Sequence, residues 1–592
     1  MSKTPPRPLT AAPGPALDNA REDMPVSTRF DDVYFSVDNG LSESREVYLK
    51  ACGLPDAWAG RERFTIGELG FGTGLNFLAA RQMWAANRPS KTARLHFVSI
   101  EGYPLSKEQL ETALSAWPEL SAFSAPLIES WPDRVRGIHR LEFEGGVSLT
   151  LCHADVKRAL RDLSLKADAW FLDGFSPAKN PDMWSPDVMQ SVFNLSAPGA
   201  KIGTFTVAGA VRRALIGAGF DVEKLPGFGR KRHRLEAIKP GKVGASKTPA
   251  PSPVIIGAGI AGAALTRSLL ARGLTPIIID PDNDSEASGN PAAIVKPRLD
   301  LQDRPQARFF LSAWLYARRA YAGNAVRHEG VAHIAKSEKE QARLEKLARQ
   351  AALPQTDMMF LAADEMAAHT GVPSEFGGLW LARSQVIDPI AVRRDWTAGA
   401  HIMSAKAAEI NASESGITLT DAAGKTLAHG SDVFVCAGAE IENLWPQAGV
   451  RYQRGQITLC ERSGELTSPL TYGGYGLPMD DRVLLGATHD RGKEILPCAP
   501  RAADDALNVA AFEAIGASVG KPLSARASVR VTTADTFPIA GNIAPGVHVM
   551  TGLGGRGFVH APLIAEALVS RLCNDPLPVA NDIMTRLSPN IP

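Results

Sequence analysis

Short apolar runs that break into glycine-rich loops recur along the chain and predict strands leading into helices. In the second half, the apolar run Val254–Ile256 precedes the loop GAGIAG and an Ala- and Leu-rich helix, and a second run, Ile277–Ile279, ends at Asp280. In the first half, the residues from Phe64 lead through ELGFGTG into a helix predicted over Phe77–Ala86. Short apolar runs bounded by glycines are typical of buried strands. The pattern predicts the α/β class.

Three further apolar runs, Leu95–Ile100, Val147–Leu151 and Ala169–Leu172, alternate with helical segments in the first half. This order predicts a parallel doubly wound, Rossmann-like sheet with ligands at the carboxyl ends of its strands. Acidic residues stand at or just after four of these ends: Glu68, Glu101, Asp155 and Asp173. We expect them to converge on one cleft, although each alone could be a solvated strand end or a helix cap.

The segment PGKVGASKTPAPSP lacks apolar periodicity and predicts a linker between two domains. We therefore expect a mobile N-terminal arm over residues 1–25, a first domain over 26–239, a linker over 240–253 and a second domain over 254–592. No internal repeat of fixed period is present, so the halves are different domains.

Composition narrows the class of protein. The chain has 592 residues, 45% of them hydrophobic and 21% charged, as in ordinary globular proteins. Its net charge of +1 does not indicate a nucleic-acid binder, although a local basic patch could still bind one. The six cysteines show no metal-binding spacing, and no long apolar stretch or signal peptide occurs. We expect a cytoplasmic monomer without metal or membrane contact.

The loop GAGIAG has the spacing of a dinucleotide site. Gly257 permits a tight turn, Gly259 lets the backbone approach a pyrophosphate, and Gly262 lets the helix pack on the strand. The N–H groups at the start of the helix suit phosphates, and the Asp280 carboxylate suits a ribose hydroxyl.

The loop of the first half, E-x-G-x-G-x-G, suits instead a ligand with a zwitterionic amino-acid end. Acids after the second and third strands, Glu101 and Asp155, suit ribose hydroxyls and an adenine amine. This constellation resembles class I S-adenosylmethionine-dependent methyltransferases. The resemblance implies a cofactor site formed by Glu68, Gly70, Gly72, Thr73, Gly74, Asn76, Glu101 and Asp155.

Asp173 begins the stretch DGFSPAKNPDMW, in which aromatic and polar residues suit a pocket for a base or an amine. Methyl transfer to nitrogen needs a neutral amine aimed at the methyl group, and Asp173 could orient that amine and help to remove its proton. We expect a catalytic role for Asp173; the alternative is an ordinary turn.

Near the end of the first half, GFGRKRHR concentrates cations that could contact a phosphate backbone, or could simply lie on a solvated face or strand edge. The candidate tRNA-binding residues in it are Arg230, Lys231, Arg232 and Arg234.

In the second half, GAGIAG, ASGN, CAGA, RGQ, VRVTTADTFPIAG and GLGGRGF together resemble the FAD-dependent D-amino-acid oxidase and glycine oxidase family. That family has a mixed-sheet substrate subdomain, and the resemblance implies that Arg530 pairs with the substrate carboxylate. The segment that follows Asn290, PAAIVKPRL, departs from the family pattern. The implied FAD-binding residues are Gly257, Gly259, Ile260, Gly262, Asp280, Ser288, Gly289, Asn290, Ala437, Gly438, Gly552, Gly554, Gly555, Arg556 and Gly557.

The first half, in FDDVYFSVDNGLSESREVYL, GELGFGTGLNFL, DGFSPAKNPDMW and PGFGRKR, resembles a family of bifunctional enzymes that modify the wobble uridine of tRNA. The resemblance implies that the oxidase half removes the carboxymethyl group of 5-carboxymethylaminomethyl-(2-thio)uridine and releases glyoxylate. The methyltransferase half would then convert the 5-aminomethyl product to 5-methylaminomethyl-(2-thio)uridine.

Two other functions fit parts of the sequence. An oxidase and N-methyltransferase for small amines such as glycine or sarcosine agrees with the near-neutral net charge. The second alternative is a flavin-containing RNA-binding scaffold whose active sites have decayed. The intact glycine loops and acidic residues argue against this alternative.

Overall fold

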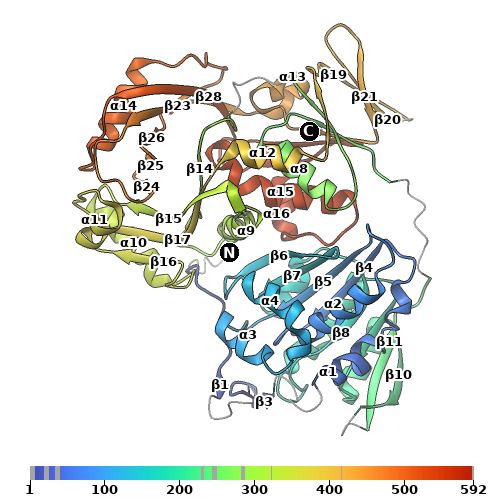
Figure 1. The fold of residues 1–592 in the computed structure, drawn as a ribbon. Helices are drawn as coiled ribbons and strands as arrows, with labels where there is room; N and C mark the ends of the chain where they lie inside the picture. Colours follow the sequence, from blue (N-terminus) through green and yellow to red (C-terminus); the bar gives the residue numbers. More distant parts are fainter. Residues whose placement is uncertain are drawn as a thin grey trace, which may run out of the picture. The chain divides into compact units, whose positions relative to one another are not determined.

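The computed structural model forms two compact units (Figure 1). The N-terminal unit comprises Ala11–Pro249 and Ser570–Asp582; the C-terminal unit comprises Met1–Thr10, Ala250–Val569 and Ile583–Pro592. The structure describes residues 7–18, 26–33, 40–228, 232–242, 250–281, 287–321, 323–414 and 416–589. Among them, no helix combines the length and the apolar character that crossing a membrane requires.

The N-terminal unit is built on an eight-stranded sheet with the order β10-β11-β9-β8-β4-β5-β7-β6. Its strands are β4 (Arg63–Leu69), β5 (Arg94–Glu101), β6 (Gly137–Phe143), β7 (Val147–His153), β8 (Ala167–Leu172), β9 (Ser196–Thr204), β10 (Asp221–Pro226) and β11 (His233–Ile238). The central strands β7, β5, β4, β8 and β9 are parallel. This confirms the predicted α/β core.

Both ends of this sheet carry antiparallel strands that were not predicted, whereas the four predicted strands are all parallel. β6 pairs antiparallel with β7, and β11 pairs antiparallel with β9 and β10. The physical reason is the length of the connections, because a short loop can join only antiparallel neighbours, whereas parallel strands need a crossover. The turn of the β6–β7 hairpin is Glu144-Gly145-Gly146, in which both glycines have positive φ, and this local turn signal was missed.

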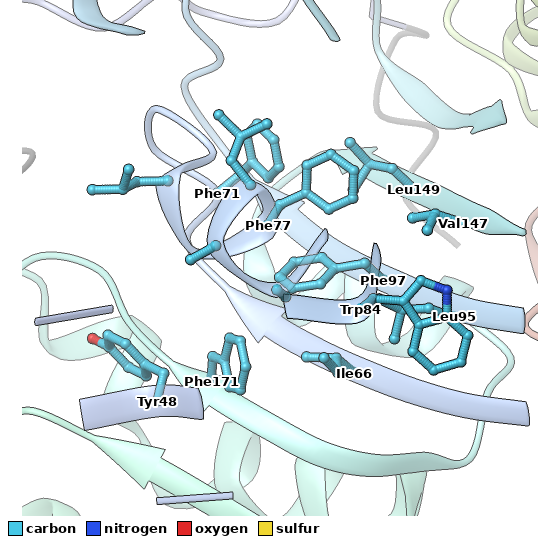
Figure 2. Packing of buried hydrophobic residues seen from close by; sticks show 14 of the residues in the cluster. Tyr48, Ile66, Phe71, Phe77, Trp84, Leu95, Phe97, Val147, Leu149 and Phe171 are labelled. Atoms are coloured by element: carbon cyan, nitrogen blue, oxygen red, sulfur yellow. The ribbon is translucent and has the colours of Figure 1, made fainter. Parts of the chain in front are cut away.

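Helices cover both faces of the sheet, which explains why β5 is buried along its whole length. Leu95 and Phe97 belong to one apolar cluster, and Val98 and Ile100 belong to another on the opposite face. Figure 2 shows the first cluster, in which Phe97 packs against Phe77. The helices are α1 (Gly40–Glu43), η1 (Ser44–Leu49), α2 (Leu75–Asn87), α3 (Lys107–Leu114), α4 (Ser121–Glu129), α5 (Val156–Asp162), α6 (Pro186–Leu195) and α7 (Gly209–Ala218).

The segment Ser570–Asp582 completes the N-terminal unit, although it is far away in sequence. Its Asp575 carboxylate is buried and lies 3.0 Å from Arg63 Nε and 3.1 Å from His96 Nε2. Arg140 Nη2 donates to the carbonyl oxygen of Pro576 at 2.6 Å. A division of the sequence at the linker alone does not reveal this contribution.

We expect Asp575→Asn to lower the free energy of unfolding of the N-terminal unit by about 1.5–3 kcal/mol, the range for hydrogen bonds to charged groups. The substitution leaves Arg63 and buried His96 without their carboxylate partner. Calorimetry of the full chain measures the effect. Asp582→Asn, at an exposed position of the same segment, is the matched control. Equal unfolding temperatures of the two variants would contradict the prediction.

The C-terminal unit contains a six-stranded sheet with the order β18-β13-β12-β22-β30-β29, in which α8 (Ile260–Leu270) follows β12. Its strands are β12 (Pro253–Ile256), β13 (Ile277–Asp280), β18 (His401–Ser404), β22 (Asp432–Val435), β29 (Ile539–Ala544) and β30 (Val547–Thr551). The strands β18, β13, β12, β22 and β30 are parallel. The strand–glycine loop–helix–strand order predicted for residues 254–280 is confirmed.

A larger mixed sheet is the second main sheet of this unit (Figure 1). It contains β14 (Ala293–Val295), β15 (Val326–Ile334), β16 (Met358–Leu361), β17 (Gly378–Ile387), β23 (Arg451–Glu461), β24 (Leu470–Thr471), β25 (Tyr475–Met479), β26 (Arg482–Gly486), β27 (Asp490–Gly492) and β28 (Pro522–Thr532). The main helices around the sheets are α9 (Pro305–Ala320), α10 (Glu338–Gln350), α12 (Pro389–Thr397), α14 (Ala502–Glu513) and α15 (Gly557–Leu572).

Part of the expected N-terminal arm is packed rather than mobile. Leu9 is buried, and its N–H donates to the carbonyl oxygen of Leu301 at 3.2 Å. Ala12 is also buried, and its N–H donates to the carbonyl oxygen of Arg134. Burial of these apolar side chains and their backbone hydrogen bonds fixes residues that composition alone suggested to be free.

Candidate cofactor and active sites

The glycine loop of the N-terminal unit turns the chain sharply from β4 into α2. Gly74 caps the helix with a φ of 77°, and a Cβ atom there would lie 2.6 Å from the Phe71 ring. A Cβ on Gly70 would lie 3.1 Å from Gly174 Cα, so this loop directly approaches the loop that begins at Asp173. The predicted donor and acceptor loops therefore meet, with Gly72 and Thr73 in the same turn.

Asn76 links two of the predicted acids. Its Nδ2 donates to Glu68 Oε1 at 3.0 Å and to Asp173 Oδ2 at 2.8 Å. Ser99 Oγ donates to Glu68 Oε2 at 2.6 Å, and Glu68 is fully buried. Burial raises the pKa of Glu68 well above its usual value and also raises the pKa of Asp173. Glu68 thus supports Asp173 through Asn76.

The other two acids differ in position. Glu101 accepts from Gly72 N–H at 2.9 Å and from Tyr103 N–H at 2.8 Å, so it is tied to the glycine loop. Asp155 is exposed and caps α5, accepting from Arg158 N–H at 3.0 Å. The described hydrogen bonds therefore join Glu68, Glu101 and Asp173 around the loop, and leave Asp155 as a helix cap at the same edge of the sheet.

Tyr48 is a member of this group that sequence reasoning missed. It is buried in η1, a π-helical turn, and its hydroxyl is hydrogen-bonded to the Asp173 carboxylate. Figure 2 shows its ring beside Phe171. Burial raises the pKa of Tyr48 well above its usual value, so it remains a donor. The available signal was the motif GLSESREVYL, but a π-helical turn places side chains differently from an α-helix.

Partly exposed aromatic rings lie next to Asp173. Phe30 stacks on Phe175 with ring centroids 4.6 Å apart and meets the edge of Tyr103 at 5.6 Å. Trp184 Nε1 donates to the Phe175 carbonyl oxygen at 3.0 Å and holds the loop in place. Gly174 N–H donates to Asp173 Oδ1 at 2.8 Å. This arrangement suits a planar base whose amine reaches the carboxylate.

Of the basic cluster, Arg230 and Lys231 lie outside the described residues. Arg232 is exposed. Arg234 lies in β11 and its Nη2 donates to Glu236 Oε1 at 2.7 Å, with only 15% of the side chain exposed. The charge of Arg234 is thus already compensated by Glu236. Contact of the four basic residues with RNA stays a prediction.

The C-terminal unit contains a cavity of about 920 Å³ lined by residues of both glycine loops. Gly257 has a φ of 102°, and a Cβ on Gly262 would lie 1.9 Å from the Gly257 carbonyl oxygen, so α8 packs directly on the turn. Asp280 Oδ2 accepts from Ala258 N–H at 2.6 Å, and Ser288 Oγ accepts from Ile260 N–H at 3.1 Å. These contacts shape the loop predicted to hold a pyrophosphate.

Most predicted FAD-binding residues line this cavity. They are Gly257, Gly259, Ile260, Asp280, Ser288, Asn290, Ala437, Gly438, Gly552, Gly554, Gly555, Arg556 and Gly557. Gly262 and Gly289 are not in the wall. The helix α15 begins at Gly557, directly after this second glycine loop.

Arg530 projects into the same cavity from β28, where it is paired with Gln453 of β23. Cβ atoms on Gly455 and Gly555 would lie 2.0 Å and 3.2 Å from its guanidinium nitrogens, so both glycines make room for it. Tyr475, whose pKa is raised by burial, interacts electrostatically with Arg530 and also lines the cavity. Tyr475 was not predicted as a site residue, because no motif around it indicates a ligand.

The residues present fit a dinucleotide cofactor. The cavity is within the range of volumes typical of ligand sites and combines glycine loops with a helix N-terminus. His560 in its wall has two buried ring nitrogens without a hydrogen-bond partner in the described part of the chain. An unpaired buried polar group is costly, and a polar ligand in the cavity offers it a partner.

Comparisons with known proteins agree with this division. Residues 118–240 match a family of S-adenosyl-L-methionine-dependent methyltransferases, and residues 254–571 match a family of FAD-dependent oxidoreductases. The C-terminal fold is similar to that of iminodiacetate oxidase from Chelativorans sp. BNC1, with a TM-score of 0.50 and 20% identity, covering 57% of this chain and 98% of that one.

Two relatives cover almost the whole chain, and both are tRNA 5-methylaminomethyl-2-thiouridine biosynthesis bifunctional proteins MnmC. The protein from Caulobacter sp. (strain K31) is 41% identical over 96% of each chain. The protein from Maricaulis maris (strain MCS10) is 40% identical over 94% of this chain and 92% of its own. The chain combines a methyltransferase using S-adenosylmethionine with an FAD-dependent oxidoreductase, and it belongs to the MnmC family of bifunctional proteins.

Proposed function

We propose that the C-terminal unit oxidises the carboxymethylaminomethyl group on the wobble uridine of tRNA and that the N-terminal unit methylates the resulting amine. The observation that carries this proposal is Arg530, a cation in the wall of the cavity predicted to hold FAD. The substrate group is an N-substituted glycine, and a guanidinium is suited to its carboxylate. Names of the full-length relatives support the same product.

In the oxidase half, Arg530 binds the glycine-like carboxylate, and Tyr475 beside it donates a further hydrogen bond. This pairing fixes the α-carbon of the substrate at one end of the cavity. FAD, when bound by the two glycine loops, supplies the acceptor for the hydride of that carbon. Water then hydrolyses the resulting substrate imine, which releases glyoxylate and leaves the 5-aminomethyl group.

In the methyltransferase half, Gly70, Gly72, Thr73 and Gly74 cradle S-adenosylmethionine, which supplies the methyl group. Glu101 binds its ribose hydroxyls, and Asp155 binds its adenine amine. Asp173 accepts a hydrogen bond from the substrate amine, and its raised pKa suits it to take a proton. Asn76, supported by Glu68, and Tyr48 hold the Asp173 carboxylate in position.

The tRNA is held by two kinds of contact. The modified base stacks on the outer face of the stacked Phe30–Phe175 pair. Arg232, together with Arg230 and Lys231, contacts phosphates near the anticodon. A tRNA substrate implies that the enzyme works in the cytoplasm.

We expect Tyr48→Phe to shift the acid limb of the methylation pH profile upward by about one to two pH units. A hydrogen bond to a charged group contributes a free energy that corresponds to a pKa shift of this size. The Tyr48 hydroxyl lowers the pKa of Asp173, so its removal makes the carboxylate protonate at higher pH. The kcat/KM for methylation of tRNA carrying 5-aminomethyl-2-thiouridine, measured against pH, tests this. An acid limb unchanged from the wild type would contradict it.

The test of the whole function is incubation of the purified protein with tRNA carrying 5-carboxymethylaminomethyl-2-thiouridine, with and without S-adenosylmethionine, followed by mass analysis of the nucleosides. We expect 5-aminomethyl-2-thiouridine without the methyl donor and 5-methylaminomethyl-2-thiouridine with it. Unchanged tRNA, together with oxidation of free glycine or sarcosine, would instead support the small-molecule alternative.

A further inference from the structure

Lys296 stands in the wall of the cofactor cavity at the end of β14, in the segment that departs from the oxidase family pattern. Its Nζ donates to Thr471 Oγ1 at 2.8 Å and lies 3.3 Å from His333 Nδ1. Thr471 Oγ1 and His333 Nδ1 are themselves 2.8 Å apart. The three side chains come from three segments and all line the cavity. Neither the glycine loops nor Arg530 accounts for this cluster.

The cluster continues toward the surface. His333 Nε2 lies 3.7 Å from Glu340 Oε1 on α10, and the side chains of His333 and Glu340 are 22% and 30% exposed. A chain of ionisable groups thus leads from the cavity wall to a carboxylate in contact with solvent. The last step is longer than a direct hydrogen bond and is one that a water molecule can bridge, so the chain offers a path for a proton.

The charges around Lys296 favour its neutral form. Desolvation by the surrounding protein and repulsion from Arg556 lower the pKa of Lys296 to about 7, and Glu340 offsets this only in part. Burial, with repulsion from Lys296, Arg343 and Arg556, lowers the pKa of His333 to about 3, so the imidazole is neutral at neutral pH. A large fraction of Lys296 therefore carries a free lone pair where an ordinary lysine would be protonated.

We propose that Lys296 is the catalytic base of the oxidase half, which takes the proton from the secondary ammonium of the bound N-substituted glycine, and that His333 and Glu340 conduct that proton to solvent. The inference rests on the proposed function. A substrate N–H bond breaks and an Nζ–H bond forms, with no change in oxidation state. The step is needed because a secondary amine is protonated at neutral pH, and only its free lone pair can form the imine.

The test is anaerobic reduction of the bound flavin by tRNA carrying 5-carboxymethylaminomethyl-2-thiouridine, followed by stopped-flow absorbance across neutral pH. In the wild type, the reduction rate should rise with pH and level off above the Lys296 pKa, near 7. In Lys296→Met, we expect a rate about 10²–10⁴-fold lower at neutral pH, the typical contribution of a general base. That rate should keep rising above neutral pH as the substrate amine loses its proton in solution.

Lys296→Arg separates charge from basicity, because arginine keeps the cation but cannot accept a proton at these pH values. We expect it to behave as Lys296→Met does. Lys336→Met removes an exposed lysine beside Gly473, in the turn between β24 and β25. The flavin of this variant should be reduced as fast as that of the wild type. Flavin absorbance and the unfolding temperature establish that each variant is folded and loaded.

The outcomes separate this inference from the function on which it rests. If this tRNA does not reduce the flavin of the wild type, the proposed function is wrong, and so is the role of Lys296 that depends on it. The second case is that the wild-type flavin is reduced and that Lys296→Met, folded and carrying FAD, shows the same rate and pH profile. Only the role of Lys296 is then overturned. Full activity of Lys296→Arg would also overturn it, because charge alone would then suffice.

Discussion

Arg530→Met is expected to lower the kcat/KM of the oxidase reaction about 30- to 5,000-fold, since removing one partner of a buried charge pair costs about 2–5 kcal/mol. The substrate carboxylate would enter the cavity without its counter-ion. The glycine loops do not depend on the Arg530 guanidinium, so FAD content should remain unchanged. Arg530→Lys should recover only part of the activity, because an ammonium lacks the planar fork that matches a carboxylate.

Release of glyoxylate from tRNA carrying 5-carboxymethylaminomethyl-2-thiouridine measures the loss. Methylation of tRNA already carrying the 5-aminomethyl group should be unchanged in the same preparation. Arg451→Met is the matched control, because Arg451 is an exposed residue of β23, the strand that pairs with β28. If Arg530→Met releases glyoxylate as fast as Arg451→Met does, Arg530 does not bind the substrate carboxylate.

Asp173→Asn is expected to slow methyl transfer about 10²–10⁴-fold, the range for general acid–base groups, while oxidation continues. The amide has nearly the same shape, but it cannot take a proton from the amine. Asn76 and the Tyr48 hydroxyl would also lose a charged acceptor. With both substrates present, the reaction should stop at 5-aminomethyl-2-thiouridine.

Single-turnover methylation of tRNA carrying 5-aminomethyl-2-thiouridine measures this rate. Asp182→Asn is the matched control in the same loop, because its carboxylate is 85% exposed and pairs only loosely with Lys157, at 3.5 Å. If the two variants methylate equally fast, Asp173 is a structural residue of the turn and not a catalytic one.

Features encoded by neighbouring residues were predictable. The order of strand, glycine loop, helix and strand at residues 254–280 depends on local steric rules, and so does the loop between β4 and α2. Apolar runs revealed the parallel centre of the first sheet, because a strand covered on both faces is apolar along its length. The edge strand β6 was not predicted because its mixed residues lack a continuous apolar run, although the two glycines before β7 are typical of a hairpin turn.

The amino-acid sequence by itself determined the two cofactor classes, the order of the halves and the acids around the first glycine loop. The tertiary structure alone decided which distant side chains touch: Tyr48 with Asp173, Asp575 with Arg63 and His96, and Lys296 with His333 and Thr471. The physical reason is range. Turn geometry and strand periodicity act between neighbours in the chain, whereas a buried polar contact depends on packing among segments that local rules do not relate.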